Sequence, residues 1–117
     1  MSARGVPIIV EGRMDEQALR KLDINGKVYC LKAHGESRFS FVDKLGTIED
    51  EVILLTDFDR EGEELRSWLY AELSRRRIRA EDKFWRRIRA LVRSEAHAVE
   101  ELPSFLRTVR LRSLALK

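Results

Sequence analysis

The sequence predicts an α/β domain, built on a mainly parallel sheet of about four strands with helices on both faces. Two apolar runs, residues 6–10 and 51–56, have the composition of buried strands. Each run is followed by a segment with apolar residues at helical spacing. Strands that alternate with helices are typical of parallel sheets, because right-handed crossovers return the chain across a sheet face.

The first half of the chain contains three of the expected strands, at residues 6–10, 27–31 and 51–56. A helix is expected between the first two, over residues 14–22. Its predicted apolar face is formed by Met14, Ala18, Leu19 and Leu22. Residues 32–40 are polar and predict a loop, which leads into a short helix at residues 41–45.

The second half is expected to be mostly helical. A long amphipathic helix is predicted over residues 61–77, with Asp59 as its N-cap. A further helix is predicted over residues 82–92, and Ser94 is a candidate cap for another that runs towards Pro103. Residues 104–117 have no clear period, so their structure stays open.

Length and composition indicate one domain. The 117 residues, 44% of them hydrophobic, suffice for a single core. We expect a core at residues 1–80 and a basic helical extension at residues 81–117 that packs on it. The single cysteine, Cys30, cannot form an intramolecular disulfide, and no apolar run has the length of a membrane span. With no signal peptide expected, we predict a cytoplasmic protein.

Acidic side chains follow two expected strands at the point where each strand ends. Glu11 follows the first strand, and Asp57 and Asp59 follow the central one. If the two strands are neighbours, these carboxylates converge, and their repulsion favours a bound cation or a protonated member. Oxygen ligands of this kind suit Mg²⁺ or Mn²⁺. Glu61 is a fourth candidate ligand, although helix capping and the helix dipole also account for Asp59 and Glu61.

The runs IIVEGRMDE (residues 8–16) and LLTDFDREGEE (residues 54–64) resemble the Toprim domain. In that family an apolar strand ends in Glu-Gly and a later strand ends in Asp-x-Asp. The domain occurs in type IA and type II topoisomerases, bacterial primases, OLD-family nucleases and the maturases of 5S ribosomal RNA. The resemblance covers roughly residues 6–77. It implies a compact Rossmann-like fold, Mg²⁺ and chemistry on nucleic-acid phosphodiesters.

The resemblance also implies roles for the acidic residues. Glu11 would be the general acid or base of strand breakage or joining, and Asp57 and Asp59 would hold Mg²⁺, with Glu61 as a third acid. As an acid near neutral pH, Glu11 needs a raised pKa, which nearby aspartates provide only while no metal neutralises them. Glu11 is therefore alternatively a metal ligand or a base.

Basic residues lie beside the acidic motifs. Arg13 and Arg60 follow them, and Lys32 ends the second strand. These cations either hold phosphates or compensate the charge of the acidic cluster. His34, in the next loop, is either a phosphate contact or a solvated side chain.

The distribution of charge adds a second indication of nucleic-acid binding. Residues 1–64 contain 9 Lys/Arg against 14 Asp/Glu, whereas residues 65–117 contain 14 against 6. The basic half either attracts phosphates or forms a solvated helical surface. Its candidate nucleic-acid contacts are Arg76, Arg86 and Arg89. Trp68 and Trp85 fall on apolar stripes, which favours core packing over base stacking.

Two features narrow the function. Topoisomerases of type IA need a catalytic tyrosine, but Tyr29 lies in an expected strand and Tyr70 on an expected core helix. Primases need elements around the Toprim core that are not recognisable here. We therefore expect a Mg²⁺-dependent protein of RNA cleavage or processing, similar to the ribosomal RNA maturases. The alternatives are a non-catalytic RNA- or ribosome-binding module and a minimal primase-like nucleotidyltransferase. RNA is favoured over DNA, and the expected state is a monomer or a homodimer.

Overall fold

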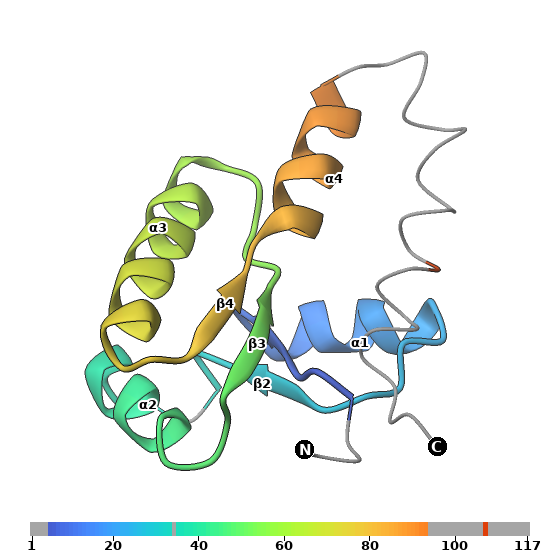
Figure 1. The fold of residues 1–117 in the computed structure, drawn as a ribbon. Coiled ribbons are helices and arrows are strands. Elements are labelled where there is room, and N and C mark those ends of the chain that lie inside the picture. The colour runs from blue at the N-terminus through green and yellow to red at the C-terminus, as the bar shows by residue number, and fades with distance from the viewer. Residues whose placement is uncertain (1–4, 34, 94–106, 108–117) are drawn as a thin grey trace.

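The computed structural model describes residues 5–33, 35–93 and 107, and it confirms the α/β class (Figure 1). Four strands alternate with four helices in this part of the chain. In order these are β1 (Ile8–Val10), α1 (Arg13–Lys21), β2 (Val28–Cys30), α2 (Arg38–Leu45), β3 (Glu51–Leu54), α3 (Arg60–Arg75), β4 (Arg79–Glu81) and α4 (Lys83–Arg93). None of the helices in the described ranges is long and apolar enough to cross a bilayer.

The sheet has the strand order β2-β1-β3-β4, and every neighbouring pair is parallel. Strand β1 lies at its centre, where Ile8 is paired with Val28 on one side and with Ile53 on the other. All the strands therefore end at the same edge, termed the carboxyl edge below. The sequence predicted this shared edge, and the pairing of β1 with β3 meets the condition for the residues that follow these strands to be neighbours there.

Strand β4 was not among the strands expected from the sequence. Its three residues, Arg-Ala-Glu, have no apolar run, and β4 forms because it pairs with the edge of β3. It also crosses the expected boundary between residues 80 and 81. The division into a core and an extension stays a prediction.

Helices cover both faces of the sheet (Figure 1). On one face, Ile9, Val52 and Leu54 pack in a buried cluster with side chains of α2 and α3. On the other face, Ile8 and Ile53 pack with buried side chains of α1 and α4. Side chains alternate across a strand, so consecutive residues of one fully apolar strand supply both clusters.

Helix α1 differs from the expected amphipathic pattern. Leu19 is buried as predicted, but Met14 is 81% exposed and Leu22 is 40% exposed. Leu22 is the C-cap of the helix, where the chain turns away from the sheet. Ile24, rather than Leu22, is the buried apolar residue after the helix, and its backbone N–H donates to the Leu19 carbonyl.

Helix α3 begins as predicted, because Asp59 caps it by accepting from the Gly62 backbone N–H at 2.8 Å. Leu65, Leu69 and Leu73 bury its apolar stripe. The helix expected from Ser94 and the tail at residues 104–117 lie outside the described residues, apart from residue 107.

Candidate active site

The four candidate carboxylates at the carboxyl edge, termed the acidic group below, are those of Glu11, Asp57, Asp59 and Glu61. Glu11 is its buried member, with 6% of its surface exposed at the end of β1. Its Oε2 accepts a hydrogen bond from the Asp57 backbone N–H at 2.7 Å. Its Oε1 accepts one from Lys32 Nζ at 3.2 Å. Glu11 thus joins the ends of three adjacent strands, and both of its oxygens act as acceptors, as in an ionised carboxylate.

Asp57 lies on the exposed side of this contact. Burial of part of the carboxyl raises the pKa of Asp57, and the negative charges of Glu11, Asp15 and Asp59 raise it further. Lys32 opposes the rise. The ionised side chain is therefore under repulsion at neutral pH, which a cation beside it would relieve.

Asp15 was not assigned a role from the sequence, although it lies within the quoted Glu-Gly motif. Its Oδ2 accepts from the Gly12 backbone N–H at 2.9 Å, at the start of α1. An acidic residue three positions after an N-cap is the sequence signal that could have identified this contact. Asp15 adds to the negative potential at Asp57.

Lys32 connects Glu11 with Glu61. Its ammonium lies 3.2 Å from Glu11 Oε1 and 3.3 Å from Glu61 Oε1. Both carboxylates raise the pKa of Lys32, chiefly through these hydrogen bonds, so it stays positively charged. Lys32 is thus an internal counter-cation of the acidic group.

The donors suit Mg²⁺ in kind, because the candidate ligands at this edge, Glu11, Asp57, Asp59 and Glu61, all offer carboxylate oxygens. Across residues 5–33, 35–93 and 107, however, no three acidic, histidine or cysteine side chains stand close enough together to hold a metal ion. Glu11 and Asp57 are neighbours, while one oxygen of Asp59 is engaged at the N-terminus of α3. Coordination by Glu11 and Glu61 together requires Lys32 to move aside.

The loop between β3 and α3 is closed by backbone contact. A Cβ atom on Gly62 would lie 2.0 Å from the Asp57 carbonyl oxygen, so only glycine fits at this position. The Thr56 hydroxyl donates to the Gly62 carbonyl at 2.8 Å. These contacts hold Asp57 and Asp59 at the end of β3.

Trp85 of α4 supports the same loop from the other side. It is 1% exposed, and its indole N–H lies 2.9 Å from the Thr56 carbonyl oxygen and 3.3 Å from that of Asp57. Its ring stacks against Phe58. The sequence predicted a buried Trp85, but its hydrogen bonds to the acidic loop depend on the tertiary structure.

Arg13 and Arg60 are exposed at the first residues of α1 and α3, beside the carboxyl edge. Arg60 lies 3.4 Å from Glu64, one turn further along α3. The positions of Arg13 and Arg60 suit contact with a phosphate that reaches the acidic group. His34 lies outside the described residues.

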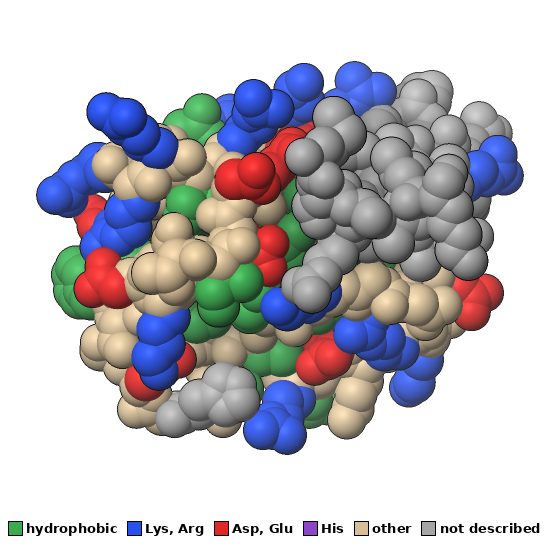
Figure 2. Space-filling model, turned by 60° about the horizontal axis from the view of Figure 1, so that its bottom comes forward, with side chains coloured by type: hydrophobic (Ala, Val, Ile, Leu, Met, Phe, Trp, Pro, Cys, Tyr) green, Lys and Arg blue, Asp and Glu red, His purple; other side chains and the backbone are tan. Residues whose placement is uncertain are grey.

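The other candidate contacts are engaged within the protein. Arg76 is at the far end of α3, away from the carboxyl edge, where it pairs with Glu72 and Asp43. Arg86 pairs with Asp82, which lies between β4 and α4, and Arg89 pairs with Glu63 of α3. On the face in Figure 2, Lys and Arg side chains are interspersed with Asp and Glu and do not form one basic patch.

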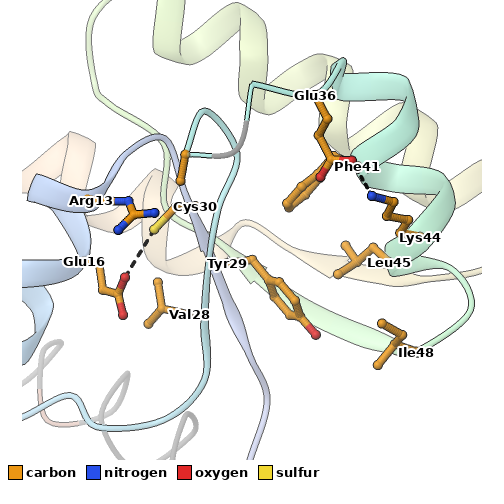
Figure 3. A pocket seen from close by; sticks show the side chains of 11 residues that line it. Arg13, Glu16, Val28, Tyr29, Cys30, Glu36, Phe41, Lys44, Leu45 and Ile48 are labelled. Atoms are coloured by element: carbon orange, nitrogen blue, oxygen red, sulfur yellow. Dashed lines mark hydrogen bonds and ion pairs between the residues drawn. The ribbon is translucent and has the colours of Figure 1, made fainter.

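A cavity of about 440 Å³ crosses the outer edge of β2, between α1 and α2. Figure 3 shows Cys30 and Glu16 on one side of the strand and Tyr29 on the other. The Cys30 thiol donates to Glu16 at 3.3 Å. Burial and then Glu16 raise the pKa of Cys30 to about 11, so the thiol is protonated and unreactive at neutral pH.

Comparison with known proteins identifies the family. Residues 6–85 match the family model of the Toprim domain. The chain is 33% identical to a UPF0292 protein of Methanosarcina barkeri over 96% of its own length and 77% of the relative. It is 39% identical to one of Thermoplasma volcanium, over 85% and 81%. With one of Pyrococcus furiosus the identity is 34%, over 94% and 81%.

No solved structure matches significantly. The family match spans the strands, the acidic motifs and the start of α4, so it includes every residue of the candidate site apart from Arg86 and Arg89. The chain therefore belongs to the Toprim domain family and is a relative of the UPF0292 proteins.

Proposed function

We propose that this protein is a Mg²⁺-dependent enzyme that cleaves or processes structured RNA in the cytoplasm, free or within a ribosomal complex. Membership of the Toprim family indicates a protein that binds metal and acts on nucleic acid. The observation that supports catalysis best is the contact between Glu11 and the Asp57 backbone. It sets a buried carboxylate beside a partly exposed one whose pKa is raised first by burial and then by repulsion from neighbouring carboxylates.

Each group has a distinct part in the proposed reaction. Asp57, Asp59 and Glu61 would hold Mg²⁺, which offsets negative charge on the phosphodiester. Glu11 accepts two hydrogen bonds, which supports a role as base or ligand rather than as acid. Lys32, once released from the carboxylates, would pair with a phosphate oxygen.

The test is cleavage of labelled structured RNA and single-stranded DNA, with Mg²⁺ or Mn²⁺, by the protein and by an Asp57→Asn/Asp59→Asn variant. A matched control is Asp23→Asn/Asp50→Asn, which changes the net charge equally. Both control residues are exposed and precede β2 and β3, at the opposite edge of the sheet. Cleavage should be lost in the first variant and kept in the control. Equal cleavage by all three proteins would overturn the proposal.

A binding module without catalysis is the second candidate. It is favoured by the engagement of Asp59 in helix capping and of Glu11 and Glu61 with Lys32. Salt-dependent RNA binding without turnover, unchanged in Asp57→Asn/Asp59→Asn, would support it. Incorporation of nucleotides would instead support a primase-like activity.

A further inference from the structure

A second cavity, of about 680 Å³, opens next to the acidic group on the side of α2. Glu61 belongs both to its lining and to the acidic group, and Lys32, which pairs with Glu61, also lines the cavity. The remaining wall comes from the loop after β2, the start of α2 and the first turns of α3. Its volume lies within the range of about 300–1,000 Å³ that is usual for small-molecule sites. A group held here would be adjacent to any phosphate at the acidic group.

Trp68 forms the aromatic part of this wall. It is half-buried, because it lies beside the stripe of Leu65 and Leu69 and packs only partly on the core. The Arg38 guanidinium lies over its ring, 4.9 Å from the centroid. Phe39 meets the ring edge-on, with centroids 5.2 Å apart. The sequence favoured core packing for Trp68, whereas the structure places it at the border of the core, in a cavity.

The carboxylates of the cavity are compensated. Glu36 pairs with Lys44 at 2.8 Å, and Glu61 pairs with Lys32. The third, Glu64, pairs with Arg60. The lining itself includes the cations Lys32 and Arg38. The cavity therefore combines an aromatic ring, a planar guanidinium and an ammonium without a large excess of negative charge.

We propose that this cavity receives an unpaired nucleobase of the strand whose phosphodiester reaches the acidic group, a proposal that rests on the proposed function. Bases of any sequence stack on tryptophan rings and on arginine planes. Lys32, between the cavity and Glu11, is in place to contact the phosphate of the same nucleotide. A base inside a duplex is already stacked and paired, so the substrate carries its scissile bond next to an unpaired nucleotide.

Intrinsic fluorescence measures the stacking directly. The other tryptophan, Trp85, is 1% exposed and hydrogen-bonded, so a base that enters the cavity changes the emission of Trp68. The probes are oligouridylate and oligodeoxythymidylate of about eight nucleotides, matched to typical single-strand site sizes. A blunt duplex of the same length is the comparison. EDTA prevents turnover during the titrations.

The decisive variant is Trp68→Leu, with Tyr70→Leu as the matched control. Tyr70 is an aromatic residue of the same helix, 45% exposed and outside the lining. Loss of one stacked base should weaken single-strand binding about tenfold in Trp68→Leu, and Tyr70→Leu should bind normally. Trp68→Phe, which keeps a stacking ring and guards against loss of folding, should keep most of the affinity. Quenching of the Trp68 emission by either oligonucleotide supports the proposal. The oligonucleotide that binds more tightly shows whether the cavity prefers a ribose or a deoxyribose strand.

Unchanged emission at saturation, equal affinity of Trp68→Leu, or equal binding of the duplex would each overturn the proposal. Its failure can be separated from that of the proposed function. If RNA is cleaved and Trp68→Leu leaves KM unchanged, the base site is wrong and the enzyme assignment stands. If no cleavage occurs but binding depends on Trp68, also in Asp57→Asn/Asp59→Asn, the base site stands and the enzyme assignment fails.

Discussion

At the scale of single residues, Lys32 balances the acidic group. Its ammonium bonds Glu11 and Glu61 within 3.3 Å, so it competes with any metal ion for the same oxygens. The pairs are partly exposed, and each is worth about 1 kcal/mol or less. Lys32 therefore limits the repulsion among the carboxylates, and a metal ion can still displace it from them.

We predict that Lys32→Met binds Mn²⁺ more tightly by roughly two- to fivefold, the equivalent of one weak ion pair, and binds RNA more weakly. Calorimetric titration of the metal and a salt series for RNA measure the two effects. Lys21→Met, an exposed change in the last turn of α1, is the control with equal charge. Weaker metal binding in Lys32→Met would show that Lys32 supports the metal site rather than competing with it.

The ionised carboxylate of Asp57 should destabilise the fold of the metal-free protein. Its pKa is raised in the fold, so its neutral form is favoured, and that stabilisation is lost as the pH rises through the folded pKa. At neutral pH, Asp57→Asn should therefore raise Tm by no more than about 2 °C, because water screens much of the repulsion at this exposed side chain. The difference should narrow as the pH falls towards the ordinary value of 3.8.

Thermal unfolding in EDTA across this pH range checks the prediction for Asp57, with Asp50→Asn as the exposed control. Saturating Mg²⁺ should reverse the order, because it stabilises only the protein that keeps its ligand. A lower Tm for Asp57→Asn at neutral pH without metal would contradict the assigned repulsion.

At the scale of elements, the turn from β3 into α3 decides the shape of the candidate site. Asp59 caps the helix, Gly62 allows the close approach to Asp57, and Thr56 closes the loop with its hydroxyl. Hydrogen bonds from Trp85 tie the same loop to α4. The acidic residues are thus held by local chemistry and by one distant helix.

Gly62→Ala should disrupt this turn, because its Cβ would lie 2.0 Å from the Asp57 carbonyl oxygen. We expect a loss of about 2 kcal/mol or more, together with loss of metal binding. Gly46→Ala is the matched control, since its Cβ would meet its neighbours at ordinary distances of 3.5–3.6 Å. Denaturant unfolding and metal titration of both variants measure the effect. If the Gly62→Ala protein is as stable as Gly46→Ala, the close approach of Gly62 to the Asp57 carbonyl is wrong.

At the scale of the whole molecule, a buried ion pair joins α3 to the carboxyl edge. Arg66 of α3 donates to Asp82, the residue after β4, at 2.6 Å, and both are buried. The Arg66 guanidinium also lies over the Trp85 ring, 4.5 Å from its centroid. The pair therefore connects the long helix, the last strand and the helix that supports the acidic loop.

Arg66→Leu should cost about 3 kcal/mol, because it leaves the Asp82 carboxylate buried, with the exposed Arg86 as its remaining ion-pair partner in the described part of the chain. Arg66→Leu/Asp82→Leu should recover much of that loss, since no buried charge remains. Arg75→Leu, which breaks an exposed pair with Glu72, should change stability little. Unfolding free energies of the three variants form the test, and a double variant no more stable than Arg66→Leu would contradict the explanation.

Local patterns were sufficient for much of the fold. The apolar runs identified β1 and β3, and helical spacing identified α3 and its cap at Asp59. These features depend on burial and on hydrogen bonds between residues close in the chain. Strand β4 and the exposure of Met14 could not be found in this way, because they depend on which segment packs beside which.

The same division applies to the site. The placement of carboxylates after β1 and β3 follows from the sequence, because the position of an acid after an apolar run is a local property. Three further features arise only from tertiary packing. Glu11 binds the Asp57 backbone, Lys32 bridges Glu11 and Glu61, and Trp68 lines a cavity. Each of these contacts joins residues from different elements, so its geometry is set only when the strands pair and the helices pack.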